Sequence, residues 1–246
     1  MSKRLIVEVI VFILVVAISG CGNNDGHGSD LTSVNWSGYQ IVGAPLGFNS
    51  AAATWDVPEV GGRDGLSATW VGIGGGAVAG DFLVDEPTLI QAGTEQDVIA
   101  GKPTYSAWWA AFPPTPEIKA GTLSLTDFPV SPGDTINVII DGTDHSVWNI
   151  SILNHDKGWT FNIQVPYVVA GLTAEWIEEL PTSTSSSTLA NFDKVDFSNL
   201  KVNGGNPNLN SRGILIDMVS PSRRLARPSN SDGDSFSVCY GSDSCN

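Results

Sequence analysis

Short apolar runs, each ended by turn residues, recur along most of the chain. Turn signals such as Val60-Gly61-Gly62 and Ser131-Pro132-Gly133-Asp134 separate these runs, and no stretch keeps a helical period over three turns. Many short strands with this punctuation predict an all-β domain, either a sandwich or a barrel. The expected strands cover residues 51–57, 67–73, 88–94, 105–112, 122–125, 135–140, 147–153, 159–165, 171–177, 194–197, 213–218 and 235–240.

One expected strand carries acidic residues in an apolar setting. The stretch 174–179 reads AEWIEE, and strand alternation places Glu175 on the same face as Thr173 and Ile177. A carboxyl group with such neighbours tends to keep its proton, which makes it a candidate for proton transfer. The same residues would also suit an edge strand whose charges prevent aggregation.

A second expected strand places polar residues on one face. The stretch 88–95 reads TLIQAGTE, and its alternation groups Gln91, Gly93 and Glu95. An amide side chain both donates and accepts hydrogen bonds, so Gln91 can act together with a carboxyl group. The two stretches together favour a functional site over a plain edge strand.

The first twenty residues have the features of a targeting segment. Lys3 and Arg4 precede an apolar stretch, and Ile18-Ser19-Gly20-Cys21 is similar to a bacterial lipobox. An ordinary signal peptide or an uncleaved anchor would show similar features. Residues after Cys21 are rich in Gly, Asn and Asp, as in a flexible tether. We expect a lipoprotein signal peptide over 1–20, lipidation at Cys21, a tether over 21–33, one domain over 34–240 and a tail over 241–246. The domain would then be exported and attached to the cell envelope by lipid, or released from it.

The charge balance is strongly acidic. The chain has 12 Lys and Arg against 26 Asp and Glu, a net charge of −14. Without a basic patch to neutralise phosphates, nucleic acid is not expected as a partner. Few positive charges remain to repel one another in acid, which suits a protein that works at low pH and equally an ordinary acidic protein.

The remaining cysteines and the histidines indicate a disulfide and no metal site. Cys239 and Cys245 form an even pair in a chain expected to be exported, which favours a disulfide between them. His27, His145 and His155 are scattered, and no Cys/His cluster has metal-ligand spacing. We expect neither a metal nor another cofactor.

When its sequence motifs are considered together, the chain resembles the glutamic peptidases, the eqolisin or G1 family of acid proteases. The resemblance implies an antiparallel β-sandwich of two large sheets, similar to lectins of the concanavalin type, with a cleft on one concave face. It also implies an endopeptidase that acts on proteins or peptides in acid; a monomer is expected. The motifs that carry it are NWSGY (35–39), WDVP (55–58), WVGIGG (70–75), LIQAGTE (89–95), YSAWWAAFPP (105–114), PGD (132–134), AEWIEE (174–179), LANFDKVDF (189–197) and ILIDM (214–218).

The resemblance assigns the catalytic dyad to Gln91 and Glu175. Peptide hydrolysis without a metal or a nucleophilic side chain needs a base to activate water and a donor for the oxyanion. Glu175 can supply the first function and Gln91 the second. The expected substrate-binding residues are Trp70, Gly93, Glu95, Tyr105 and Trp109.

The chain departs from the family pattern near this dyad. Members usually carry acidic residues at positions 74 and 110, an aspartate at position 95 and an aromatic at position 111. This chain has Gly74, Ala110, Glu95 and Ala111 there, and residues 77–87 look inserted. A pseudoenzyme on the same fold therefore stays open as an alternative, as does a lectin-like binding module whose tryptophans stack on sugars. Retention of both dyad residues favours the enzyme.

Overall fold

The computed structural model describes residues 31–75, 77–79, 82–84, 86–116, 118, 120–181, 187–241 and 245. The predicted signal peptide, the lipidation site Cys21 and the tether up to residue 30 lie outside the described residues. Within the described part, no helix is long and apolar enough to cross a membrane.

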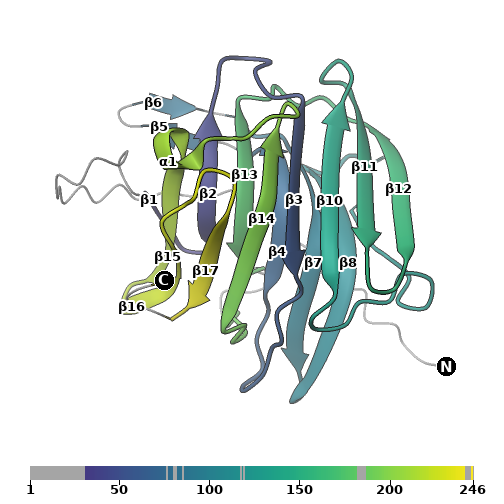
Figure 1. Ribbon diagram of the computed structural model, residues 1–246, viewed down its shortest axis with the longest axis vertical. Helices are drawn as coiled ribbons and strands as arrows, with labels where there is room; N and C mark the ends of the chain where they lie inside the picture. Colours follow the sequence, from purple (N-terminus) through teal and green to yellow (C-terminus); the bar gives the residue numbers. More distant parts are fainter. Residues whose placement is uncertain are drawn as a thin grey trace.

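The strands form two layers that face each other (Figure 1). Because the chain consists of short apolar runs between turns, almost all regular structure is β, with one short helix, α1 (Leu209–Arg212). One layer contains, in hydrogen-bonded order, β12 (Trp159–Pro166), β11 (Val147–Asn154), β10 (Thr135–Gly142), β3 (Ser50–Asp56), β14 (Lys194–Val202) and β17 (Phe236–Tyr240). The other contains β2 (Trp36–Val42), β13 (Thr173–Glu179), β4 (Ala68–Gly74), β7 (Leu89–Ile99), β8 (Lys102–Phe112) and β9 (Gly121–Thr122).

The two layers are connected along one side by hydrogen bonds. Strand β17 pairs with β16 (Arg223–Pro228), which pairs with β15 (Ile214–Ser220), and β15 pairs with β2. The predicted antiparallel sandwich is confirmed, and its two layers belong to one continuous sheet. Strands β5 (Ala77–Ala79) and β6 (Phe82–Val84) form a separate hairpin between β4 and β7.

The folded part begins earlier than the sequence predicted. Strand β1 (Leu31–Ser33) pairs in parallel with β15, and the Leu31 side chain is buried. The expected tether over 21–33 is therefore wrong for its last three residues. These residues enter the sheet because Leu31 joins a small apolar cluster, and Ser33 Oγ accepts hydrogen bonds from the N–H groups of Asn35 and Trp36.

Aromatic side chains fill the space between the layers. Trp55, Trp148, Trp176, Phe192 and Phe197 are fully buried there. The indole N–H of Trp148 donates to a backbone carbonyl at 2.9 Å, and that of Trp176 does the same at 2.9 Å. A large aromatic group is stable in a core when its polar atom finds such a partner.

The same core holds one carboxyl group, that of Glu178. It accepts hydrogen bonds from the hydroxyl groups of Ser67 and, at 2.6 Å, Thr69. Gln96 Nε2 donates to Thr69 Oγ1 at 2.8 Å and to Ser67 Oγ at 3.2 Å, which completes the network. Burial raises the pKa of Glu178 to about 8, although these hydrogen bonds oppose the shift. The carboxyl group is therefore neutral in mild acid.

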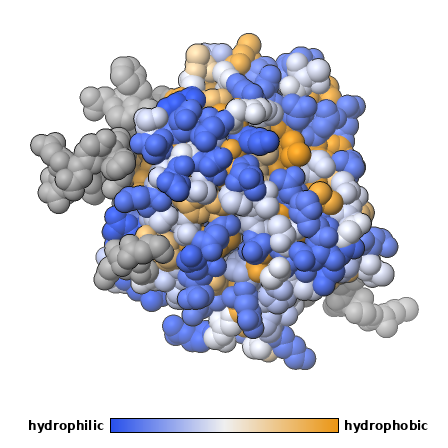
Figure 2. Space-filling view, viewed as in Figure 1, coloured by the Kyte–Doolittle hydropathy of each residue, from blue (hydrophilic) through white to orange (hydrophobic). Residues whose placement is uncertain are grey.

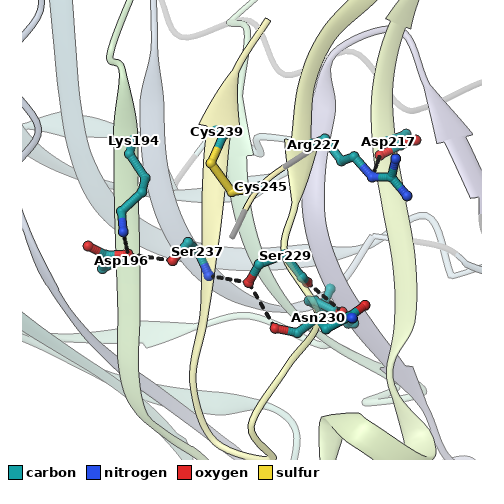
Figure 3. Close-up of a disulfide and its surroundings, with 10 residues drawn as sticks. Lys194, Asp196, Asp217, Arg227, Ser229, Asn230, Ser237, Cys239 and Cys245 are labelled. Carbon is teal, nitrogen blue, oxygen red and sulfur yellow. Dashed lines mark hydrogen bonds and ion pairs between the residues drawn. A yellow bond between two sulfur atoms is a disulfide. The ribbon is translucent and has the colours of Figure 1, made fainter. Parts of the chain in front are cut away.

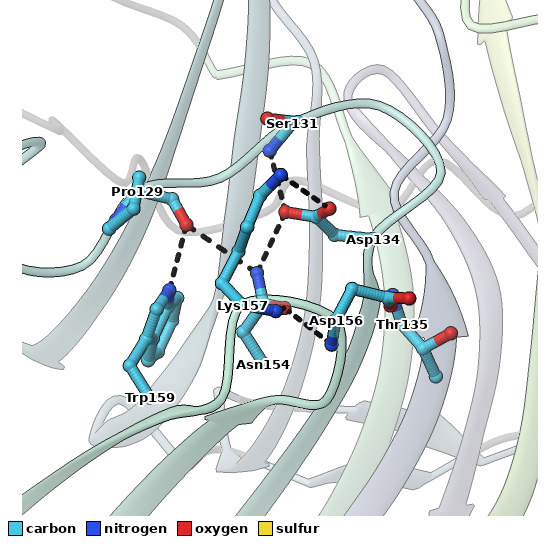
Figure 4. Close-up of polar contacts among 8 residues, drawn as sticks. All are labelled: Pro129, Ser131, Asp134, Thr135, Asn154, Asp156, Lys157 and Trp159. Atoms are coloured by element: carbon cyan, nitrogen blue, oxygen red, sulfur yellow. Dashed lines mark hydrogen bonds and ion pairs between the residues drawn. The ribbon is translucent and has the colours of Figure 1, made fainter.

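The PGD motif forms a tight turn before β10 (Figure 4). Asp134 accepts hydrogen bonds from the Ser131 N–H and from Asn154 Nδ2, both at 2.8 Å, and lies 3.4 Å from Lys157 Nζ. Gly133 has φ +80°, a conformation that favours glycine. The Asp134 side chain therefore joins the turn to the hairpin of β11 and β12.

A disulfide joins Cys239 on β17 to Cys245, with 5.5 Å between their Cα atoms (Figure 3). This is the pair expected from the sequence. Figure 3 also shows an ion pair on the neighbouring strand β14, in which Lys194 Nζ lies 2.9 Å from the Asp196 carboxylate. The face shown in Figure 2 is mostly hydrophilic, in keeping with the alternating buried and exposed residues of β10.

Candidate active site

Glu175 and Gln91 lie in one row across three strands. Glu175 on β13 is paired with Gly72 on β4, and Gly72 is paired with Gln91 on β7. Residues directly opposite on neighbouring strands point to the same side of a sheet, so both side chains leave the same face. Strands lie about 4.8 Å apart, which places the two backbones about 10 Å apart with only a glycine between them. Glu175 and Gln91 therefore flank Gly72 on one face of the sheet.

This face is opposite the core between the layers. It carries its own buried cluster, which includes Trp36, Trp70, Leu89, Trp108 and Ile177. Trp36 and Trp70 pack edge to face with ring centroids 5.0 Å apart. Apolar surroundings of this kind exclude water from the polar groups among them and strengthen electrostatic interactions.

The side chains of Gln91 and Glu175 are both buried and available for hydrogen bonding. Gln91 and Glu175 are each 0% exposed. Among the described residues, no group makes a hydrogen bond of normal geometry to the amide atoms of Gln91 or the carboxyl oxygens of Glu175. Buried polar groups are nearly always hydrogen-bonded in folded proteins. Within the described part of the chain, these two groups therefore have unused hydrogen-bonding capacity.

The environment of Glu175 favours its protonated form. Burial raises its pKa well above the ordinary value, and the charge of Glu86 raises it further. The nearby hydroxyl of Thr173 opposes this shift. A carboxyl group in this state is suited to exchange a proton during a reaction.

Glu86 is a site residue that sequence reasoning missed. It follows the β5–β6 hairpin and is buried, with its carboxyl oxygens accepting hydrogen bonds from the N–H groups of Gly171 (2.7 Å) and Leu172 (2.8 Å). It belongs to the stretch that looks inserted, so no family motif marks it. The signal available was a pair of acidic residues, Asp85 and Glu86, directly before Pro87.

A group of carboxyl side chains lies further along the same face. Glu179 and Glu95 flank Ala68 in one row, as Glu175 and Gln91 flank Gly72. Glu179 accepts hydrogen bonds from Trp70 Nε1 at 2.8 Å and from Asn35 Nδ2 at 3.2 Å. Burial raises its pKa to about 7 despite these donors.

Glu95 therefore lies on the expected face, where it forms a pair with the carboxyl group of Asp97. Its neighbour two residues on, Asp97, accepts a hydrogen bond from the Ser67 N–H at 3.2 Å. Burial, and then the charge of Glu95, raise the pKa of Asp97 to about 8. Burial also raises the pKa of Glu95, while its hydrogen bond with Asp97 opposes the shift. The pair therefore holds a proton in mild acid.

Trp70 and Gly93 lie on the site face and pack against each other. A Cβ at position 93 would meet Thr69 O at 2.0 Å and Trp70 Cβ at 2.7 Å. The glycine is thus required for packing within the sheet, because the chain itself fills the space beside it. Trp70 also covers Gly72, because a Cβ at position 72 would meet its ring at 2.8 Å.

Tyr105 and Trp109 are corrections to the predicted site. Their partners on β7 are Gln96 and Ala92, so both side chains point into the core between the layers. Tyr105 Oη accepts a hydrogen bond from a backbone N–H at 3.2 Å instead of lining the site. The tryptophan of β8 that does share the site face is Trp108, which sequence reasoning passed over because two tryptophans are adjacent.

The departures from the family pattern fall on both faces. Gly74 has φ +89°, and a Cβ there would meet Thr88 O at 2.1 Å, so this backbone does not accept a side chain. Ala110 is paired with Gln91 and shares the site row. Ala111 belongs to the core between the layers. Only position 110 thus leaves a smaller group beside the dyad itself.

The sequence profile of the Peptidase A4 family matches residues 34–240, most of the chain. The chain belongs to the Peptidase A4 family. It is therefore a glutamic-type peptidase, a hydrolase of peptide bonds. No curated protein sequence matches the chain.

Solved structures of glutamic peptidases have the same fold as this family member. A crystal structure of scytalido-glutamic peptidase with a transition-state analogue inhibitor is 21% identical, with a TM-score of 0.69 over 84% of this chain and 98% of that one. SCP-B, described as an eqolisin in complex with the tripeptide Ala-Ile-His, is 20% identical, with a TM-score of 0.64 and the same coverage. Aspergilloglutamic peptidase from Aspergillus niger is 26% identical, with a TM-score of 0.58 over 71% of this chain and 98% of that one.

Proposed function

We propose that this Peptidase A4 member is an acid-acting endopeptidase whose reaction uses Glu175, Gln91 and one water molecule. The observation that carries the proposal is the shared row of the two side chains. They are buried on one face, separated by Gly72, and form no hydrogen bond of normal geometry to described residues. The apolar cluster around them provides the low dielectric in which a few polar groups act strongly.

The proposed reaction needs no group beyond these and the substrate. Ionised Glu175 takes a proton from water while the water oxygen bonds to the carbonyl carbon of the substrate. The carbonyl oxygen becomes an oxyanion, which the amide N–H group of Gln91 stabilises. The C–N bond then breaks as Glu175 returns its proton to the amine nitrogen, giving a carboxylic acid and an amine.

The state of Glu175 limits this reaction at low pH. The reaction begins with ionised Glu175, and its pKa is raised by burial and by Glu86. The ionised fraction decreases as pH falls through this raised pKa, so the rate decreases as well. We therefore expect an acid limb above pH 4.5, the ordinary value for a glutamate.

Digestion of a denatured protein over a series of acidic pH values tests the proposal. The purified wild-type protein should cleave it, and Glu175→Gln should abolish cleavage while its melting temperature shows that it is folded. Gln91→Ala should lower kcat on the order of a hundredfold, a typical cost for losing an oxyanion donor. Glu59→Gln, at an exposed position, serves as the control. Pepstatin, which targets paired aspartates, should not inhibit.

Two outcomes would reject this function. Full activity in a folded Glu175→Gln protein would refute the mechanism. Absence of cleavage by the wild-type protein at every pH tested would instead favour a pseudoenzyme, in which the departures at positions 74, 95, 110 and 111 have removed turnover.

The anchoring of the enzyme is a separate part of the proposal. We infer that the protein is exported and attached to the cell envelope through lipid on Cys21, on the strength of the lipobox-like sequence before it. Intact mass of the protein made in a bacterial host should show a modified Cys21 as the first residue. An unmodified mass, or cleavage elsewhere, rejects this anchor without affecting the proposed reaction.

A further inference from the structure

Glu86 connects the inserted segment to the strand that carries Glu175. It is 1% exposed, and its two carboxyl oxygens accept hydrogen bonds from the N–H groups of Gly171 and Leu172 at 2.7 and 2.8 Å. These two residues directly precede β13, which begins at Thr173. Charge-assisted hydrogen bonds to backbone N–H groups are short and strong. Glu86 therefore fixes the entry to β13 two residues before Glu175.

The two carboxyl groups have opposite surroundings. Backbone N–H groups favour the ionised form of Glu86, although burial raises its pKa. Glu175 receives no hydrogen bond of normal geometry from the described residues. Two neighbouring carboxyl groups in a buried site do not both ionise readily, because like charges repel. Their surroundings thus assign the negative charge to Glu86 and the proton to Glu175.

The strands beside Glu175 bring no other charge to its row. Strand β2 contributes Gln40, β4 contributes a glycine and β7 contributes Gln91, all neutral. Glu179 lies two residues beyond Ile177 on β13, and its carboxyl oxygens accept hydrogen bonds from Trp70 and Asn35. Among the residues that the structure describes, Glu86 is accordingly the charged group that raises the pKa of Glu175.

We propose that Glu86 is a positioning residue of this active site, which anchors the inserted segment to β13 and sets, through its charge, the pH at which Glu175 becomes a base. The backbone at Gly74 does not accept an acidic side chain, so the charge beside the dyad comes from the insertion instead. This proposal rests on the proposed function of Glu175 in its catalytic part. Its electrostatic part stands on the structure alone.

The pH profile of kcat/KM for Glu86→Gln tests the catalytic part. Removing the charge makes Glu175 easier to ionise, so the acid limb should move to lower pH by on the order of one pH unit. Glu59→Gln removes one exposed charge as a matched control and should leave the limb in place. A merely structural role for Glu86 would lower kcat or stability without moving the limb. An unmoved limb in a folded, active Glu86→Gln protein overturns the proposal.

A titration of the wild-type protein tests the electrostatic part without any variant or activity. In protein labelled with 13C-glutamate, the side-chain carboxyl signals of Glu86 and Glu175 report their ionisation directly. Glu86 should ionise at the lower pH of the two, and the reverse order overturns the proposal. If the wild-type protein cleaves nothing while this order holds, the proposed function fails and the electrostatic role of Glu86 stands.

Discussion

The buried carboxyl group of Glu178 should make the fold less stable as pH rises. Its pKa lies near 8 in the folded protein, against 4.5 as the ordinary value, so the folded state holds a proton that the unfolded chain releases. Between these two values the unfolded state binds fewer protons, and the free energy of unfolding therefore falls with rising pH. Each pH unit corresponds to about 1.4 kcal/mol for one such group. The interval of about 3.5 units allows a loss on the order of 3 to 5 kcal/mol, a large part of a typical stability of about 5–15 kcal/mol.

The substitution Glu178→Gln isolates this effect. Glutamine keeps the size and can still bond the hydroxyl groups of Ser67 and Thr69, but it has no proton to lose. Below about pH 5 the two proteins should differ little, and by about pH 8 the variant should be the more stable by several kcal/mol. Urea unfolding at a series of pH values measures both, with Glu59→Gln as a control for net charge. If wild type and Glu178→Gln lose stability in parallel as pH rises, the account of this network is wrong.

Three further changes test other parts of the structure. Asp134→Ala should lower the free energy of unfolding by on the order of 2–3 kcal/mol, since the buried Asn154 amide and the partly buried Ser131 N–H lose their acceptor; a loss below about 0.5 kcal/mol in urea unfolding would contradict the role of the turn. Gly93→Ala should destabilise the protein by at least about 3 kcal/mol, because its Cβ meets backbone at 2.0 Å; a variant with normal melting but weaker substrate binding would restore the substrate-contact interpretation. Cys239→Ser should fold with a modest loss, because the loop to Cys245 is short, and labelling of both native thiols without prior reduction would disprove the disulfide.

The pH dependence of the proposed reaction and the pH dependence of the stability have the same cause, which is the burial of carboxyl groups. Ionisation of Glu175 limits the proposed reaction at low pH, and ionisation of Glu178, Glu179 and Asp97 destabilises the fold at higher pH. The two effects overlap above pH 4.5, where the proposed activity should rise and the stability should fall. The low content of Lys and Arg, considered from the sequence alone, gave only a general reason for acid tolerance.

Alternation along single strands predicted much of the fold and the faces of Gln91 and Glu175, whereas the dyad itself was assigned from the resemblance to the glutamic peptidases and stays a prediction. In the runs around Gln91 and Glu175, alternation alone shows which residues share a face, without knowledge of the neighbouring strands. Strand β16 was missed because Arg223, Arg224 and Pro228 interrupt its apolar pattern. The acidic end of β13 fitted an edge strand, whereas the structure places β13 between β2 and β4. Charged residues enter a central strand when hydroxyl and indole groups supply partners, and those partners come from distant parts of the chain.

The errors in the predicted site arose where alternation did not distinguish the site face of a strand from its core face. In YSAWWAAF both faces of the strand are apolar or aromatic, so only the register with β7 shows that Trp108 shares the site face and Trp109 does not. Glu86 was missed for another reason. Its position depends on the path of an inserted segment and on two backbone N–H groups 85 and 86 residues away. No local pattern records such a contact.

The place of β13 in the sheet has a consequence for how the enzyme comes into being. This strand begins at Thr173 and is inserted between β2 and β4, which end at Val42 and Gly74 and do not pair with each other. Closing loops of this length is slow, and folds dominated by such contacts form late and cooperatively. A chain still emerging from a ribosome or a translocation channel cannot bring Glu175 opposite Gln91 until residue 179 is free. If Glu175 and Gln91 act as proposed, chains that lack β13 are inert, and proteolytic capacity arises only after this late strand has been delivered and paired.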